Sequence, residues 1–477
     1  MNYTQFLNMI PEATLIVILV VVFFADFCSA KSETRRWFNP LCAVLLALQL
    51  VPCVLALPSQ AFGGMYQATA ATNVMKVILT AATLIVVLMA RPWLSREDTK
   101  HMEGEFYMIA ISTLLGMYMM MSAGHFLLFY LGLEMASIPM ACIVAMDKKK
   151  KLSAEAGAKY ILTAAFSSGI MIYGISLLYA AVGTLYFDDV ADKLTASPLT
   201  ILGLVFFFSG LGFKISLVPF HFWTADTYQG APTTVTAYLS VVSKGAAAFT
   251  LCVILSKVFA AMTQHWHIIL YIVIVLSICV ANLFAIRQKE LKRFMAFSSI
   301  SQAGYIMLAV VGDNALGLTA LMYYVLIYVA ANLAVFAVIS VVEQHCDGKT
   351  DIDDYNGFYQ TNPRLSFLMT LALFSLAGIP PFAGMFSKFF VFMAAAQTGD
   401  LWAYVVVFIA LINTVVSLYY YLLIVKAMYI KKSQHPLPTF QSENSVKYAL
   451  ALCTVGILLF GVASICYQWI ANAAGVA

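Results

Sequence analysis

The chain has 477 residues, of which 62% are hydrophobic and only 10% charged, and its formal net charge is +4. Soluble chains carry about 25% charged residues, so this composition excludes a soluble globular protein. The Lys and Arg residues are scattered through short loops rather than gathered on one face, which excludes a nucleic-acid-binding protein.

Apolar segments of about 20 residues recur along the whole chain, and a helix of this length crosses the hydrocarbon core of a bilayer. We therefore predict an all-α polytopic membrane protein, surrounded by lipid and folded as one domain over residues 1–477. The first segment has no basic start and no small-residue cleavage site, so we expect it to be retained. The fourteen predicted spans are 7–28, 39–57, 73–90, 105–122, 125–146, 154–182, 199–225, 233–259, 267–286, 294–311, 315–342, 365–397, 402–430 and 446–472.

The loops differ in charge on the two sides of the predicted membrane domain. Alternate loops are rich in cations, whereas the intervening loops contain only Lys193. Because cytoplasmic loops carry the excess of Lys and Arg, we predict that both termini lie on the outer side. The predicted inner cations are Lys31, Arg35, Arg36, Arg91, Arg96, Lys100, Lys148, Lys149, Lys150, Lys151, Arg287, Lys289, Lys292, Arg293, Lys349, Arg364, Lys431, Lys432 and Lys447.

Prolines interrupt two of the spans. The seventh contains Pro219 and the twelfth contains Pro380 and Pro381. Proline removes a backbone donor, so both helices are predicted to be discontinuous. The breaks are five spans apart, which suggests two inverted five-helix repeats: spans 4–8 in 105–259 and spans 9–13 in 267–430. Residues 1–104 then hold the first three helices and 446–472 the last.

Four charged residues lie in the middle of apolar spans: Glu134, Lys214, Lys244 and Lys388. A charge at bilayer depth is costly, so each is a candidate functional residue, and together they suggest a path for protons. A structural role is the alternative for each. Glu134 would be a packed carboxyl, one lysine would neutralise Glu134, and Lys388 would anchor the helix break.

The other ionisable residues in or beside the spans are less telling. Lys159 lies about five residues into the sixth span, where a structural role and a functional role are equally compatible with its position. Lys76, Lys257 and Lys426 lie nearer span ends, and we expect their amines to reach the interface by snorkelling. His221 follows the first helix break, where it would either bridge a water chain or cap the broken helix.

The sequence offers no sign of redox chemistry in this chain. Its nine cysteines form no CxxC pair. Phosphate-binding glycine loops and nucleophile elbows are also missing. We expect no cofactor and no metal in this chain.

Five stretches resemble the antiporter-like membrane subunits of respiratory complex I, the proton-pumping NADH:quinone oxidoreductase. The turn Tyr228–Pro232 (YQGAP) resembles the N-type members in particular, and Lys388 stands where the M-type members and the sodium/proton antiporter relatives have glutamate. The five stretches are FYLGLEMASIP (129–139), EAGAKYILTAAFSSGIMIYG (155–174), GLGFKISLVPFHFW (210–223), KRFMAFSSISQAGY (292–305) and AGIPPFAGMFSKFF (377–390).

The resemblance assigns roles to the buried charges. Glu134 and Lys214 would form a pair between the fifth and seventh helices, and Lys159 would be a further charge near it. Lys244 would be the central relay lysine, and Lys388 the terminal one towards the outer face.

The resemblance also implies a function and partners. The chain would couple quinone reduction by NADH to proton transfer across a bacterial inner membrane. Its partners would be M-, L-, K- and J-type membrane subunits and, indirectly, a peripheral arm, with FMN, iron–sulfur clusters and quinone held in other subunits. Three alternatives stay open: a multisubunit cation/proton antiporter without a redox partner, a passive scaffold, and a chloroplast-type or ferredoxin-fed relative.

Overall fold

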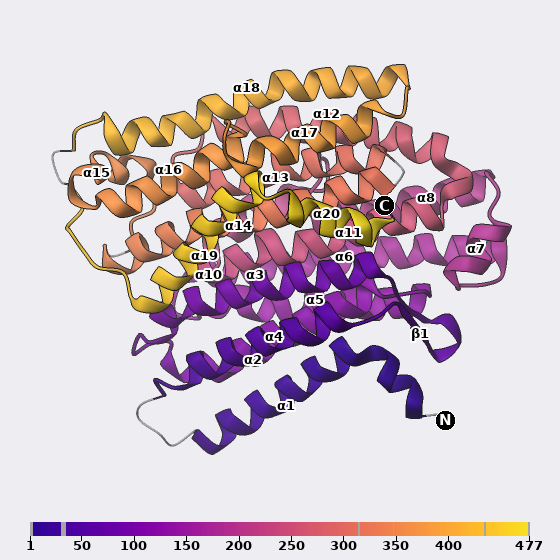
Figure 1. Ribbon diagram of the computed structural model, residues 1–477, viewed down its shortest axis with the longest axis horizontal. Helices are drawn as coiled ribbons and strands as arrows, with labels where there is room; N and C mark the ends of the chain where they lie inside the picture. The colour runs from indigo at the N-terminus through magenta and orange to yellow at the C-terminus, as the bar shows by residue number, and fades with distance from the viewer. Residues whose placement is uncertain (1–2, 30–34, 313–314, 347, 434–435, 476–477) are drawn as a thin grey trace.

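The computed structural model describes residues 3–29, 35–312, 315–346, 348–433 and 436–475. Long helices run side by side in an elongated bundle (Figure 1). Lys31, one of the predicted inner cations, lies outside the described residues.

Thirteen helices in the described chain are long and apolar enough to cross a membrane. The remaining predicted span consists of two shorter apolar helices, α16 and α17, so apolar helices lie at all fourteen predicted positions. The helices are α1 (Ile10–Ser29), α2 (Phe38–Leu55), α3 (Ala70–Leu94), α4 (Glu103–Met121), α5 (Phe126–Val144), α6 (Lys151–Val182), α7 (Phe187–Lys193), α8 (Pro198–Ile215), α9 (Phe222–Gly230), α10 (Thr233–Tyr238), α11 (Lys244–Lys257), α12 (Thr263–Ala285), α13 (Leu291–Val311), α14 (Ala315–His345), α15 (Phe358–Thr361), α16 (Pro363–Ala377), α17 (Ala383–Ala396), α18 (Leu401–Tyr429), α19 (Asn444–Val462) and α20 (Ser464–Ala474).

The two predicted helix breaks are confirmed. The first separates α8 from α9 around Pro219, and the second separates α16 from α17 around Pro380 and Pro381. Both upstream half-helices end at a left-handed residue, Ser216 with φ 68° and Gly378 with φ 87°. The inverted symmetry of the two five-helix units stays a prediction.

The last span differs from its prediction, because it is not one helix. It divides at Ala463 into α19 and α20. Just before this break Gly461 lies against the backbone of α17, where an added Cβ would come within 2.9 Å of the Ala383 Cα. This close approach of two helices is a tertiary contact, and no proline or charge in the sequence predicted the break beside it.

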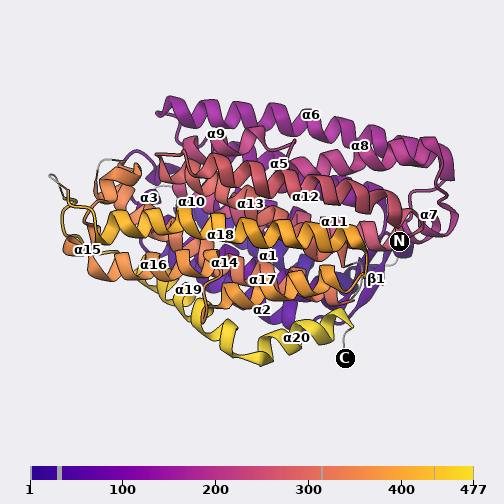
Figure 2. The same cartoon turned by 90° about the horizontal axis from the view of Figure 1, so that it is seen from above.

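The centre of the bundle is formed by α10, α11, α13 and α14, which are buried along almost their whole length. The outer positions belong to helices such as α1, α6 and α18 (Figures 1 and 2). Residues Leu239–Ser243, between α10 and α11, form a π-helical turn. Lys244 follows this turn directly, and such turns recur at functional sites.

One end of the bundle is closed by a small hairpin. Strands β1 (Ser59–Ala61) and β2 (Tyr66–Ala68) pair antiparallel, and Tyr66 also bridges to Ala123. The hairpin, α7 and both ends of the chain lie towards the same end of the molecule, and α15 lies at the opposite end (Figure 1). The hairpin therefore covers the beginning of α3.

Candidate functional site

Lys214 lies in the last turn of α8, just before the first helix break. Its buried Nζ donates hydrogen bonds to the Ser137 hydroxyl of α5, at 2.7 Å, and to the Tyr160 hydroxyl of α6, at 3.1 Å. The break thus places an amine where three helices meet.

Glu134 lies one turn before Ser137 on α5, so the two side chains share a helix face. The carboxylate is only half-buried, and its buried Oε1 has no hydrogen-bond partner among the described residues. Glu134 interacts electrostatically with Lys214, but no direct ion pair joins them in the described chain. The predicted pair is therefore brought close, with the Ser137 hydroxyl as the direct partner of the amine.

Lys159 has partners of its own. Its Nζ forms ion pairs with Glu155 at 2.6 Å and with Asp226 at 2.7 Å, and it is partly exposed. Asp226 also pairs with Arg293 of α13 at 2.6 Å. Burial disfavours the Asp226 carboxylate, but the hydrogen bonds from Lys159 and Arg293 outweigh this and hold its pKa below the usual range. Lys159 thus fastens α6 to α9 and, through Asp226, to α13, and it does not contact Glu134 or Lys214.

Lys244 is buried in the centre of the bundle. Its Nζ donates to the Ser299 hydroxyl of α13 at 2.6 Å and lies 5.2 Å from the centre of the Tyr228 ring. The Tyr328 hydroxyl of α14 donates to the same Ser299 oxygen at 3.0 Å. No carboxylate contacts Lys244 in the described part of the chain, where the Ser299 hydroxyl is the hydrogen-bond partner of its amine.

Aromatic side chains fill the space between Lys214 and Lys244. The Trp223 ring lies 5.2 Å from the Tyr160 ring and 6.4 Å from the Tyr228 ring. Its indole nitrogen donates to the Phe213 carbonyl at 3.1 Å, beside the first helix break. The two lysines are therefore linked by a row of three aromatic rings, those of Tyr160, Trp223 and Tyr228. Tyr160, near Lys214, and Tyr228, near Lys244, each carry a hydroxyl group.

Lys388 lies at the second helix break. Its Nζ donates to the Ala377 carbonyl, the last residue of α16, at 2.9 Å, and lies 5.0 Å from the centre of the Tyr305 ring. The amine thus caps the negative end of a half-helix, which is the contact expected of a structural anchor.

A small cavity joins Lys388 to the surroundings of Lys244. Lys388, Tyr328, Gln302 and Ser375 line it, and the Ser375 hydroxyl has no hydrogen-bond partner among the residues that the structure describes. Tyr328 contacts Ser299, which contacts Lys244. Polar groups therefore connect the two lysines, and the anchoring role of Lys388 does not exclude a role in transfer.

His221 adds little to this arrangement. It is half-buried beside the first break, its ring stacks on Phe222 with centroids 4.7 Å apart, and its buried Nδ1 has no hydrogen-bond partner in the described chain. No hydrogen bond caps α9 through its side chain. A place in a water chain stays a prediction.

The snorkelling predicted for Lys76 is wrong. Its side chain is 0% exposed and forms a 2.6 Å ion pair with Glu12 of α1, itself 1% exposed. Tyr66 of the hairpin donates to Glu12 at 2.9 Å and accepts from Lys76 at 3.2 Å. These contacts with Glu12 and the hairpin hold the Lys76 amine inside the bundle. The sequence offered one signal for this pair, because Glu12 and Lys76 lie at similar depth in the first and third predicted spans.

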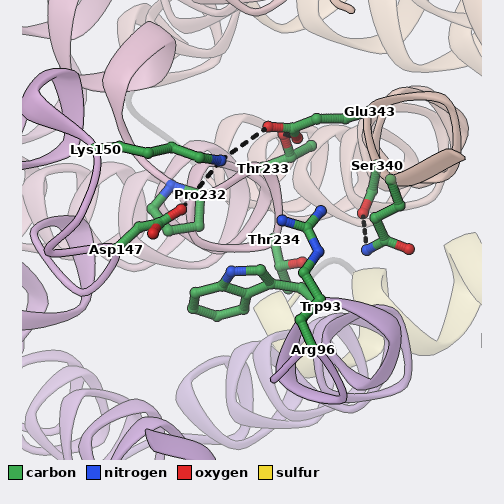
Figure 3. A pocket seen from close by; sticks show the side chains of 10 residues that line it. Trp93, Arg96, Asp147, Lys150, Pro232, Thr233, Thr234, Ser340 and Glu343 are labelled. Atoms are coloured by element: carbon green, nitrogen blue, oxygen red, sulfur yellow. Dashed lines mark hydrogen bonds and ion pairs between the residues drawn. The ribbon is translucent and has the colours of Figure 1, made fainter. Parts of the chain in front are cut away.

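A second charged cluster, also missed from the sequence, lies at the end of α14 (Figure 3). Lys150 reaches between Asp147, at 3.1 Å, and Glu343, at 4.0 Å. The Thr233 hydroxyl at the start of α10 donates to Glu343, and Arg96 lines the same pocket. This cluster lies at the start of α10, which continues through the π-helical turn into α11 and Lys244.

Comparison with known proteins agrees with the motifs. Residues 123–417 match the family described as NADH:quinone oxidoreductase/Mrp antiporter, transmembrane. The NADH-quinone oxidoreductase subunit N of Phocaeicola vulgatus is 58% identical over 99% of this chain and 100% of its own length.

Solved structures share the fold. A chain of respiratory complex I from Thermus thermophilus superimposes with a TM-score of 0.81 at 31% identity, covering 96% of this chain and 98% of its own. A chain of the Mrp complex from Dietzia sp. superimposes with a TM-score of 0.85 at 18% identity, covering 100% and 97%, which is a likeness of fold alone. The family predicted from the motifs is confirmed. The chain belongs to the NADH:quinone oxidoreductase/Mrp antiporter transmembrane family and, within it, to the NADH-quinone oxidoreductase subunit N family.

Proposed function

We propose that this chain moves protons across the membrane through Lys214, Lys244 and Lys388, as a subunit of a proton-pumping NADH:quinone oxidoreductase. The observation that carries the proposal is the environment of Lys244, a buried amine bonded to Ser299 and free of carboxylate contacts in the described chain. Burial without a counter-charge disfavours the ammonium form. Such an amine releases a proton easily when its surroundings change.

The path has a defined order in this proposal. Protons enter at Lys214, pass to Lys244, and leave by way of Lys388. The cluster of Glu343, Thr233 and Lys150 provides a second entry to Lys244. Tyr328 donates to Ser299 in this structure, so the Ser299 hydroxyl must first turn to donate to Tyr328. The two hydroxyls then carry the proton from Lys244 to the cavity at Lys388, where ordered water would satisfy the Ser375 hydroxyl.

Glu134 and Lys214 set the timing in this proposal. An anionic Glu134 near Lys214 stabilises the ammonium, and loss of that charge releases the proton towards Lys244. The Ser137 and Tyr160 hydroxyls give the Lys214 amine neutral partners in either state. Lys159 holds α6, α9 and α13 in register from outside the path.

We place the electron-transfer chemistry in other subunits. FMN, iron–sulfur clusters and quinone would bind there, and M-, L-, K- and J-type subunits would be the membrane partners. The complex would reside in the bacterial inner membrane. Purifying the native complex and identifying its subunits by mass spectrometry tests this assignment. Flavin and iron–sulfur subunits are expected to co-purify, whereas a set of antiporter subunits alone would favour a cation/proton antiporter.

The proposed topology places both termini outside. A reporter that is active only in the outer compartment should be active when fused after residue 477 and silent when inserted in the 147–153 loop. The reverse pattern would overturn the orientation taken from the loop charges.

Glu134→Ala and Lys214→Ala should each lower proton uptake and quinone reduction together while the complex remains assembled. The two activities fall in parallel because a blocked proton path stalls the linked redox reaction. Inverted vesicles supplied with NADH report both rates at once. The matched control is Lys193→Ala, an exposed cation in an outer loop. Normal pumping in both variants would favour the scaffold alternative.

A further inference from the structure

A deep groove runs between α16 and α19, away from the buried lysines. It encloses about 1440 Å³, including the space open to its surroundings. Its walls are apolar along the helices, where Leu365, Leu368, Leu450, Ala451 and Val455 line it. Its mouth, at the beginning of both helices, is polar.

The charged side chains at the mouth of the groove are both cations. Arg364 and Lys447 line the groove, and no carboxylate does. Both are exposed, and neither forms an ion pair in the described part of the chain. Glu443 lies one turn before Lys447 without pairing to it. In the described part of the chain, no carboxylate therefore pairs with either of the two cations beside the apolar slot.

The mouth of the groove is formed by the segment before α19, which is hydrogen-bonded to the start of α16. The Asn362 side chain donates to the Pro438 carbonyl at 2.9 Å and accepts from the Phe440 backbone at 3.2 Å. The Thr439 hydroxyl donates to the Thr361 carbonyl at 3.2 Å. These contacts tie the segment before α19 to the start of α16, so the polar mouth and the apolar slot keep a set spacing.

The length of the groove along α19 is close to the thickness of the hydrocarbon region of one leaflet. Lys447 and Val455 are eight residues apart on α19, which is about 12 Å of helix at 1.5 Å per residue. Half of the hydrocarbon core of a bilayer is about 15 Å. A molecule with an anionic head at Arg364 and Lys447 would therefore place its acyl chain along Leu368 and Val455.

We propose that this groove binds one anionic phospholipid, with its phosphate between Arg364 and Lys447 and an acyl chain between α16 and α19. On the proposed orientation the lipid comes from the inner leaflet, where anionic lipids and basic side chains attract each other. The bound lipid would fill the gap beside the broken twelfth span and brace α16 against α19.

The test uses the intact complex in nanodiscs of phosphatidylcholine that contain a small fraction of phosphatidylglycerol with a photoreactive acyl chain. After illumination, labelled peptides from 363–368 and 450–455 are expected. Arg364→Gln/Lys447→Gln should reduce this labelling about 30-fold, the loss expected for two cationic contacts with an anionic headgroup.

The control removes two other exposed cations from the same side, Lys148→Gln/Lys149→Gln, and should leave the labelling unchanged. Photoreactive phosphatidylcholine should label the groove weakly, and equally in all variants. Three results would overturn the proposal: undiminished labelling in the Arg364/Lys447 variant, equal labelling by both lipids in the unaltered complex, or cross-links from the groove to another polypeptide in place of lipid.

Discussion

Lys244→Arg is expected to lower proton uptake roughly 100-fold, at the lower end of the range that a positioned proton-transfer group contributes. Arginine keeps the positive charge but stays protonated in proteins. If Lys244 only supplies positive charge, arginine should replace it. If Lys244 must release a proton, arginine should fail. The complex should still insert and assemble, and uptake into inverted vesicles is the measurement.

Size is the complication, because the guanidinium is bulkier than the amine. Lys244→Met has similar length and cannot carry a proton, and Ser299→Ala removes the hydroxyl that solvates the amine without adding bulk. A relay predicts that all three variants fail. Near-normal uptake with arginine, and poor uptake with methionine, would mean that Lys244 only supplies charge. Lys426→Arg, at an exposed lysine, is the matched control and should pump normally.

Lys76→Met is expected to lower the free energy of unfolding by about 3–5 kcal/mol, the cost of leaving one partner of a buried ion pair alone. Glu12 would remain between Tyr66 and Ser122 with its cation gone. The midpoint of denaturant-induced unfolding in detergent, followed by circular dichroism, measures the loss.

The double variant Glu12→Gln/Lys76→Met should regain most of that stability, because it leaves no unpaired charge. Lys257→Met breaks an exposed ion pair with Asp188 and should cost only about 0–1 kcal/mol. A Lys76 variant as stable as the Lys257 variant would show that the Glu12–Lys76 pair does not hold α1 to α3.

The parts of the fold that follow from local chemistry were predictable. Apolar length gave the fourteen crossings, and Pro219, Pro380 and Pro381 located both interior breaks, because proline acts on its own helix. At the break at Ala463, Gly461 packs on α17, a tertiary contact that no local pattern records.

In the candidate site, too, the features that follow from local sequence were predictable and the tertiary contacts were not. Mid-span charge identified Lys214, Lys244 and Lys388, since a charge at that depth is costly and its position can be read from the sequence. Their hydroxyl partners come from helices distant in sequence, such as Ser137 for Lys214 and Ser299 for Lys244. Lys76 was misjudged because the cover that Tyr66 provides is a tertiary contact.

We propose that NADH oxidation drives protons through this chain. The most direct test records internal acidification of inverted vesicles on addition of NADH, and then on addition of a sodium or potassium gradient without NADH. We predict acidification with NADH, its loss in Lys244→Arg, and no response to either cation gradient. Acidification by a cation gradient alone, abolished by Lys244→Arg, would contradict the account and assign the chain to a cation/proton antiporter.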